Sequence, residues 1–106
     1  MDKTAVLGII NQFKIILESK SVSVNKIILF GSYMTGKFKE GSDIDLVIIS
    51  DDFKSKAYWE RIDLLSDAIY EVFKPIEAVA LTSDEWEKEE SMVVDYARDG
   101  EVVYAV

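Results

Sequence analysis

The chain has 106 residues, a length suited to one domain over residues 1–106, and its 49% hydrophobic content is that of a compact protein. It contains no cysteine and no histidine, which excludes disulfides, histidine bases and most zinc sites, so a metal would need oxygen ligands, as Mg²⁺, Mn²⁺ or Ca²⁺ does. No leader or membrane span is visible, so we expect a cytoplasmic protein, and the net charge of −8 disfavours nucleic acid as the main partner.

The N-terminal part of the chain predicts one helix followed by one strand. Apolar residues recur at helical spacing, and Asp2 is the candidate N-cap. These apolar residues are Val6, Ile9, Ile10, Phe13, Ile16 and Leu17. The run KIILF at 26–30 ends at Gly31, and its length and β-branched content predict a buried strand.

A second strand is predicted from DIDLVIIS at 43–50. Its alternation places Asp43, Asp45 and Val47 on one face, whereas Ile44, Leu46 and Ile48 occupy the other. Only about a dozen residues separate it from the first strand, which leaves room for a short helical turn and a glycine-containing loop.

The C-terminal half predicts a helix, a strand and a charge-rich helical region. Tyr58, Ile62, Leu65, Ile69 and Val72 form one helical face, and the aromatics Tyr58, Trp59, Tyr70 and Phe73 are interpreted as core. The run IEAVAL at 76–81 is a third strand, with Glu77 on the same face as Val79 and Leu81. A helical region ending at Arg98, whose stretch 84–90 is a solvated face, and an extended tail at 101–106 follow. This alternation of helices and strands predicts an α/β domain around a small sheet.

The stretch FGSYMTGKFKEGSDIDL at 30–46 nearly contains a P-loop. Gly31, Gly36 and Lys37 fit that pattern, but the next residue is Phe38, which has no hydroxyl for Mg²⁺. The next predicted strand begins six residues after Lys37, so the helix that a P-loop requires does not fit. We therefore set the P-loop interpretation aside.

A second interpretation joins Gly31 and Ser32 to Asp43 and Asp45. A Gly-Ser turn at a strand end offers a phosphate close backbone approach, N–H groups and a hydroxyl. Asp43 and Asp45 share one strand face with Cα atoms roughly 7 Å apart, so their carboxylates can converge on hard cations. Asp43 alone is explained by an Asx-turn, and Gly31-Ser32 alone by an ordinary turn, so only the combination is specific. Asp45 differs, because an unpaired carboxylate inside an apolar strand costs stability.

The spacing Gly-Ser, ten residues, Asp-x-Asp resembles the signature of the DNA polymerase β-like nucleotidyltransferase superfamily, with the ten residues running from Tyr33 to Ser42. The surrounding FGS…G…SDIDL is similar to that of the minimal nucleotidyltransferase (MNT) family, and the resemblance covers nearly the whole chain. It implies an α/β (α+β) fold, a small mixed β-sheet packed with helices. It also implies similarity to the antitoxins of HEPN/MNT toxin–antitoxin pairs.

The resemblance implies roles for the site residues. Gly31 and Ser32 would hold the nucleoside triphosphate, and Asp43 and Asp45 would bind the Mg²⁺ or Mn²⁺ ions that bridge it. Glu77, the only acid in the third predicted strand, would be the third catalytic and metal-binding carboxylate and would activate the acceptor hydroxyl. The family more often has Asp at that place, and Glu77 has the alternative interpretation of an ordinary polar residue on an edge strand.

Positions 33–35 are a second departure from the family. The residues are Tyr, Met and Thr, where an arginine is common. Lys37 and Lys39 are candidates to replace its charge toward the nucleotide, but as point charges rather than bidentate forks. Their alternative interpretation is that of solvated loop lysines.

The resemblance implies a nucleotidyltransferase that transfers AMP from Mg-ATP to a tyrosine of a HEPN-type toxin and thereby acts as an antitoxin. An acidic surface suits a protein that meets an RNA-binding partner. One alternative is an antitoxin or nucleotide-binding module that masks the toxin without catalysis. Another is transfer to a small-molecule hydroxyl, with the acceptor pocket supplied by a homo-oligomer.

Overall fold

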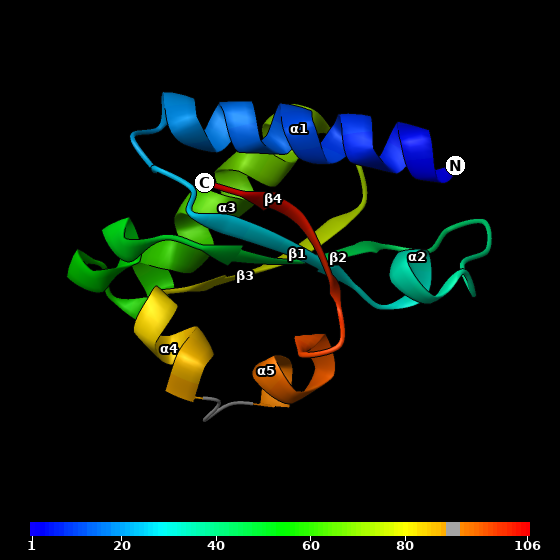
Figure 1. Ribbon diagram of the computed structural model, residues 1–106. Coiled ribbons are helices and arrows are strands. Elements are labelled where there is room, and N and C mark those ends of the chain that lie inside the picture. Colours follow the sequence, from blue (N-terminus) through cyan, green and yellow to red (C-terminus); the bar gives the residue numbers. More distant parts are fainter. Residues whose placement is uncertain (89–91) are drawn as a thin grey trace.

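Four strands form one mixed sheet in the computed structural model, which describes residues 1–88 and 92–106 (Figure 1). The strands are β1 (Lys26–Phe30), β2 (Ile44–Ile49), β3 (Ile76–Leu81) and β4 (Glu101–Ala105). Their order is β3-β2-β1-β4, with β2 parallel to β3 and the other neighbouring pairs antiparallel. The predicted mixed sheet is confirmed.

The C-terminal segment differs from the expectation of an extended tail, because it is the edge strand β4. It pairs with β1 through partners that include Lys26 and Ala105. The Val106 N–H group donates a hydrogen bond to the Asn25 carbonyl oxygen at 3.0 Å. The sequence pattern did not show this pairing, because the partner strand lies more than 70 residues earlier in the chain.

Helices lie on both faces of this sheet (Figure 1). The helices α1 (Lys3–Ser19) and α3 (Tyr58–Val72) pack on one face, and α4 (Ser83–Lys88) and α5 (Met92–Ala97) lie on the other. The larger core on the α1 and α3 side includes Val6, Phe13, Leu17, Ile27, Leu29, Ile44, Leu46 and Ile48. The smaller core is built from Ile28, Val47, Ile49 and Ala97. The face alternation predicted for β2 is therefore confirmed.

Helix α1 forms as its sequence predicts. The Asp2 carboxylate accepts a hydrogen bond from the Ala5 N–H group at 2.8 Å, which satisfies one of the unpaired donors of the first turn. Its predicted stripe is buried except for Ile16, which is partly buried. Two helical segments, the charge-rich α4 and the mostly apolar α5, take the place of the predicted region ending at Arg98. Positions 89–91, and with them the end of the acidic stretch 84–90, lie outside the described residues.

The prediction of a core role for the aromatics of α3 is wrong. The exposed fractions of Tyr58, Trp59, Tyr70 and Phe73 range from 66% to 84%. The buried face of α3 instead contains Leu65 and Ala68. A side chain as small as that of Ala68 allows the helix to approach the sheet closely, and at 100° per residue Trp59 and Tyr70 then point away from it.

Two short helical segments connect the larger elements. The turn α2 (Ser32–Thr35) follows β1 directly, as predicted, and the 3₁₀ segment η1 (Asp51–Ser55) follows β2. Within the ranges 1–88 and 92–106, no helix has the length and apolar character needed to cross a membrane.

Candidate functional site

The predicted site residues come from three strand ends that meet at one edge of the sheet. Because β1 and β2 are antiparallel, the last residue of β1, Phe30, lies opposite Asp45 near the start of β2. Because β2 and β3 are parallel, Asp45 also lies beside Glu77. The α2 turn follows Phe30 immediately, and Figure 1 shows it next to the start of β2. The topology thus brings Gly31, Asp45 and Glu77 together.

Gly31 has a steric role that the sequence did not reveal. A Cβ atom at this position would overlap the Oδ2 atom of Asp45, and the backbone has a φ angle of +74°. Both conditions exclude an ordinary side chain. The Gly-Ser turn is therefore in contact with the strand aspartate, so a phosphate held by the turn would lie beside that carboxylate.

The Asp45 carboxyl is surrounded by like charge. Partial burial, a side-chain hydrogen bond with Glu77, and repulsion from Glu77 and Asp43 raise the pKa of Asp45 to about 6. Two carboxyl groups that share a hydrogen bond do so through a proton that one of them retains. Asp43 and Glu77 are exposed, whereas Asp45 is only partly exposed. A divalent cation would relieve the same repulsion that the shared proton relieves here.

The residues present suit a hard cation. All three candidate ligands are carboxylates, the donor type that Mg²⁺ and Mn²⁺ prefer. Among residues 1–88 and 92–106, no three acidic side chains are already arranged as a metal-binding group. Mg²⁺ is usually held by one or two carboxylates together with substrate phosphates, so a complete cage of protein ligands is not required.

The α2 turn presents backbone donors toward this edge. The Gly31 carbonyl oxygen accepts hydrogen bonds from the N–H groups of Met34 and Thr35, at 3.2 and 3.1 Å. The preceding N–H groups, those of Ser32 and Tyr33, have no acceptor inside the helix. These two N–H groups and the Ser32 hydroxyl are therefore the candidate donors to a phosphate.

The lysines of the following loop are exposed. Lys37 and Lys39 lie between α2 and β2, and in the described part of the chain neither forms an ion pair. The Lys39 N–H group donates to the Ser42 hydroxyl at 3.0 Å, which shapes the loop. The side chain of Tyr33, at a position where the family often has arginine, is buried and stacks on Phe38 with ring centroids 4.7 Å apart. A cation for the nucleotide would thus come from Lys37 or Lys39.

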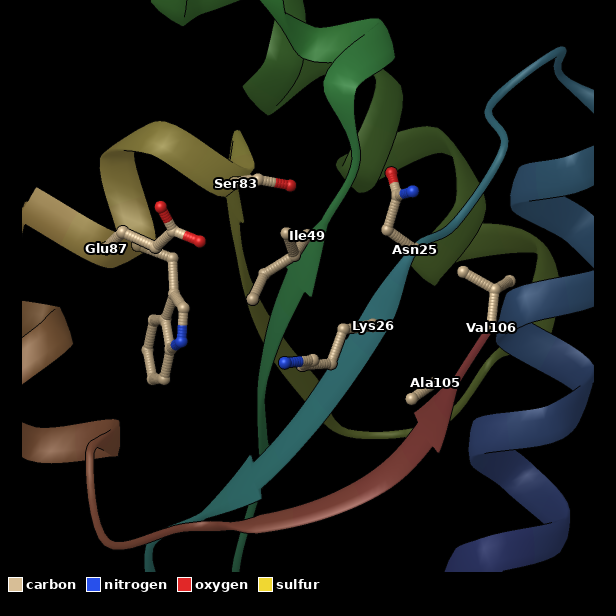
Figure 2. A pocket seen from close by; sticks show the side chains of 8 residues that line it. Asn25, Lys26, Ile49, Ser83, Glu87, Ala105 and Val106 are labelled. Carbon is tan, nitrogen blue, oxygen red and sulfur yellow. The ribbon is translucent and has the colours of Figure 1, made fainter.

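A pocket of about 190 Å³ lies at the opposite end of the sheet and is separate from this site (Figure 2). Figure 2 shows the side chains of Lys26 and Ser83 around it, together with Ile49 at the end of β2. Ile49 lies six residues after Asp43, which corresponds to roughly 20 Å along the strand. Asp43, Asp45 and Glu77 do not line this pocket.

A family model described as the nucleotidyltransferase domain matches residues 10–98. The chain belongs to this family. No curated protein sequence matches the chain significantly. Membership supports nucleotidyl transfer as the general activity, and it agrees with the Gly-Ser turn and the strand aspartates at one sheet edge.

Several solved structures are similar to this nucleotidyltransferase. A toxin–antitoxin complex with AMP-PNP matches with a TM-score of 0.63 and 21% identity, over 91% of this chain and 73% of that one. A structure assigned to a nucleotidyltransferase matches with a TM-score of 0.62 and 28% identity, over 88% and 95%. A tri-AMPylated HEPN toxin in complex with an MNT antitoxin, from Shewanella oneidensis, matches with a TM-score of 0.54 and 22% identity, over 92% and 71%. The two toxin–antitoxin complexes, at 21% and 22% identity, show that the fold is shared and nothing more.

Proposed function

We propose that this nucleotidyltransferase transfers AMP from Mg-ATP to a tyrosine hydroxyl of a HEPN-type toxin and acts as its antitoxin. The observation that carries the proposal is the contact of the Gly31 turn with Asp45, whose carboxyl in turn shares a hydrogen bond with Glu77. The residues that we propose as phosphate donors, metal ligands and base are thereby adjacent. The similar complexes described as toxin–antitoxin pairs, one with AMP-PNP and one with an AMPylated toxin, support the choice of nucleotide and partner.

Each residue would have a distinct role. The backbone N–H groups after Gly31 and the Ser32 hydroxyl would bind the triphosphate, and Lys37 would add positive charge from the loop. Asp43 and Asp45 would hold Mg²⁺ or Mn²⁺, which when bound neutralises charge on the triphosphate. These residues would fix the α-phosphorus in line with an incoming hydroxyl.

Glu77 would act as the general base. The acceptor tyrosine oxygen forms a bond to the α-phosphorus, the bond from that phosphorus to the bridging oxygen breaks, and pyrophosphate leaves. The tyrosine proton passes to the Glu77 carboxylate, which is exposed at the sheet edge and therefore open to a large partner. In the hydrogen bond between the two groups the proton belongs to Asp45, the group with the raised pKa, and a metal ion bound there would replace it.

Toxin masking without catalysis is the second candidate function. The burial of the Tyr33 ring against Phe38 favours it, because no fixed cation then stands next to the Gly-Ser turn. Lys37 is exposed on a loop, and a flexible ammonium holds a triphosphate less firmly than a bidentate guanidinium.

One labelling experiment separates the two functions. The chain is incubated with Mg²⁺, labelled ATP and the purified protein encoded by the neighbouring gene, for which we expect a HEPN-type toxin, in parallel with Asp43→Asn/Asp45→Asn and Glu77→Gln variants. We expect label on a tyrosine of the partner, and we expect both variants to lose it. Glu87→Gln, at the pocket in Figure 2 and away from the site, is the matched acidic control and should label normally. A tight complex without label, unaffected by the variants, would establish masking and contradict transfer.

A further inference from the structure

Helix α3 has an apolar outer surface. We define the α3 stripe as Trp59, Ile62, Tyr70 and Phe73, whose exposed fractions are 66%, 45%, 81% and 84%. With the exposed Ser66 between them, these positions recur at steps of three, four, four and three residues and so form one line along the helix. The line faces away from the buried Ala68, and only Ile62 borders the sheet, where it lines a hollow with Leu65 and Ala78. Core packing therefore does not explain it.

The size of the α3 stripe suits a protein interface. Three aromatic side chains and one isoleucine at these exposures present roughly 500 Å² of apolar surface. A stable interface covers about 800 Å² on each partner, and the aromatic residue types found here are those that supply most of the binding energy. Most of one standard interface is thus present on a single helix.

One flank of the α3 stripe is acidic. Asp63 and Asp67 lie one helical turn apart beside it, both exposed. In the ranges 1–88 and 92–106 neither forms an ion pair. The whole chain carries a net charge of −8. A second copy would bring the same acidic flank and the same net charge against this surface, which disfavours a homodimer through α3. A partner with an apolar hollow bordered by lysines or arginines fits it.

The stripe leads toward the candidate active site. Helix α3 ends at Val72, Phe73 is its C-cap, and β3 begins at Ile76. The Pro75 carbonyl oxygen accepts a hydrogen bond from the Ile44 N–H group at 2.8 Å, which ties this connection to the residue after Asp43. The Phe73 end of the stripe therefore lies at the same edge of the sheet as Glu77. A partner that covers the stripe can reach the carboxylates around the edge strand β3.

We propose that the α3 stripe and its acidic flank are the docking surface for the basic face of the HEPN-type toxin, and that they hold the toxin at the edge of the sheet where Glu77 lies. This inference rests on the proposed function for the identity of the partner. It assigns to the exposed aromatics a role in affinity rather than in the chemical step.

The test measures binding of the purified HEPN-type protein to the full chain by calorimetry. We expect Trp59→Ala and Tyr70→Ala/Phe73→Ala each to weaken binding by about 30-fold or more. Asp63→Lys/Asp67→Lys should weaken binding more strongly at low salt than at high salt, because salt screens the charges. Leu7→Ala removes an exposed apolar side chain of α1 that lines a hollow with Val103 and Tyr104 on the β4 side, and it should bind normally. Circular dichroism confirms that each variant is folded.

A second readout distinguishes docking from catalysis. In the labelling reaction the stripe variants should raise the KM for the partner and leave kcat unchanged, because the stripe does not touch the reacting atoms. Stripe variants that bind as tightly as the wild type would overturn the inference and leave the proposed function intact. A wild-type chain that does not bind the partner would refute the proposed function, and the docking inference with it. If the wild type sediments as a homodimer and the stripe variants as monomers, while partner binding is unchanged, the inference is also overturned.

Discussion

Strand β3 has a carboxylate beside it at each end, and the pKa values of these two groups shift in opposite directions. At its start, Asp45 shares a hydrogen bond with Glu77, and the pKa of Asp45 is raised to about 6 by burial and like charge. After its end, burial alone would raise the pKa of Glu85, but the Thr82 N–H group and the Arg61 guanidinium lower it. The Arg61 Nη1 and Glu85 Oε1 atoms are 2.7 Å apart.

The difference separates Asp45, for which we propose a role in metal binding, from Glu85, which stabilises the fold. The Glu85 carboxylate accepts a hydrogen bond from the Thr82 N–H group at 2.7 Å and another from the Arg61 guanidinium at 2.7 Å. One carboxylate therefore joins α3 to the first turn of α4. It stabilises the fold. At the other end of β3, repulsion between the carboxylates of Asp45 and Glu77 costs stability at neutral pH. Groups with such perturbed pKa values are frequent at functional sites.

The largest effect is expected from Asp45→Asn. The amide keeps the shape against Gly31 but loses the charge for a metal, so we expect the labelling rate to fall by at least about 100-fold. The free energy of unfolding in urea at neutral pH should stay the same or rise, since a source of repulsion is removed. Glu85→Gln is the matched change and should lower stability while leaving the labelling rate within about two-fold. Full activity of Asp45→Asn would refute its assigned role.

Gly31→Ala should affect both stability and activity. The added methyl group would overlap the Asp45 carboxylate, and the alanine would be held at a positive φ angle. We therefore expect the free energy of unfolding to fall by about 2 kcal/mol or more, and labelling to be lost. Gly36→Ala is the control, because its φ is +82° but no atom lies within 4 Å of the added carbon. It should cost only about 1 kcal/mol. Equal losses would show that the contact with Asp45 is unimportant.

Arg61→Met tests the structural end of the strand. The Arg61 side chain is only 13% exposed, lies over the Phe53 ring at 5.8 Å, and donates to the Ala80 carbonyl oxygen. Methionine keeps the packing and removes the charge, so we expect roughly 1–2 kcal/mol of destabilisation by urea unfolding, with the labelling rate unchanged. Lys54→Met, from an exposed pair at 4.0 Å, should change stability by less than about 0.5 kcal/mol. Similar losses in both variants would contradict the structural role of Arg61.

The smallest effect is on the pH dependence of stability without metal. The native state holds a proton on Asp45 more tightly than the unfolded state does, so this group makes stability fall as pH rises from about 4 to 6. Glu85 acts in the opposite sense: its contribution is present above its ordinary pKa and is lost as pH falls through the lowered value. Because solvent screens these partly exposed groups, each change should be about 1 kcal/mol or less.

Unfolding of the wild type, Asp45→Asn and Glu85→Gln in chelator between about pH 3 and 7 tests this sign, because the Glu85 contribution is lost below its ordinary pKa. The stability difference between wild type and Asp45→Asn should shift against the wild type as pH rises. The difference between wild type and Glu85→Gln should shift in favour of the wild type. Parallel curves for all three proteins would contradict the opposite pKa shifts.

The sequence by itself determined the local features of this protein. Apolar runs and spacing located α1 and the strands β1 to β3, and Asp2 caps α1 as its residue type predicts. The Gly-Ser and Asp-x-Asp spacing led to the nucleotidyltransferase family, which the family model confirms. These features are readable because they depend on residues close together in the chain, through helix period, strand alternation and capping chemistry.

Only the tertiary structure decided which of these features meet. The pairing of Asp45 with Glu77 depends on the register of two parallel strands, and the ion pair of Arg61 with Glu85 passes from α3 to α4. The rotation of α3, which exposes Trp59 and Tyr70, depends on how closely Ala68 lets the helix approach the sheet. Such contacts are set by packing between distant segments, and a pattern of residue types along one segment contains no information about the partner segment.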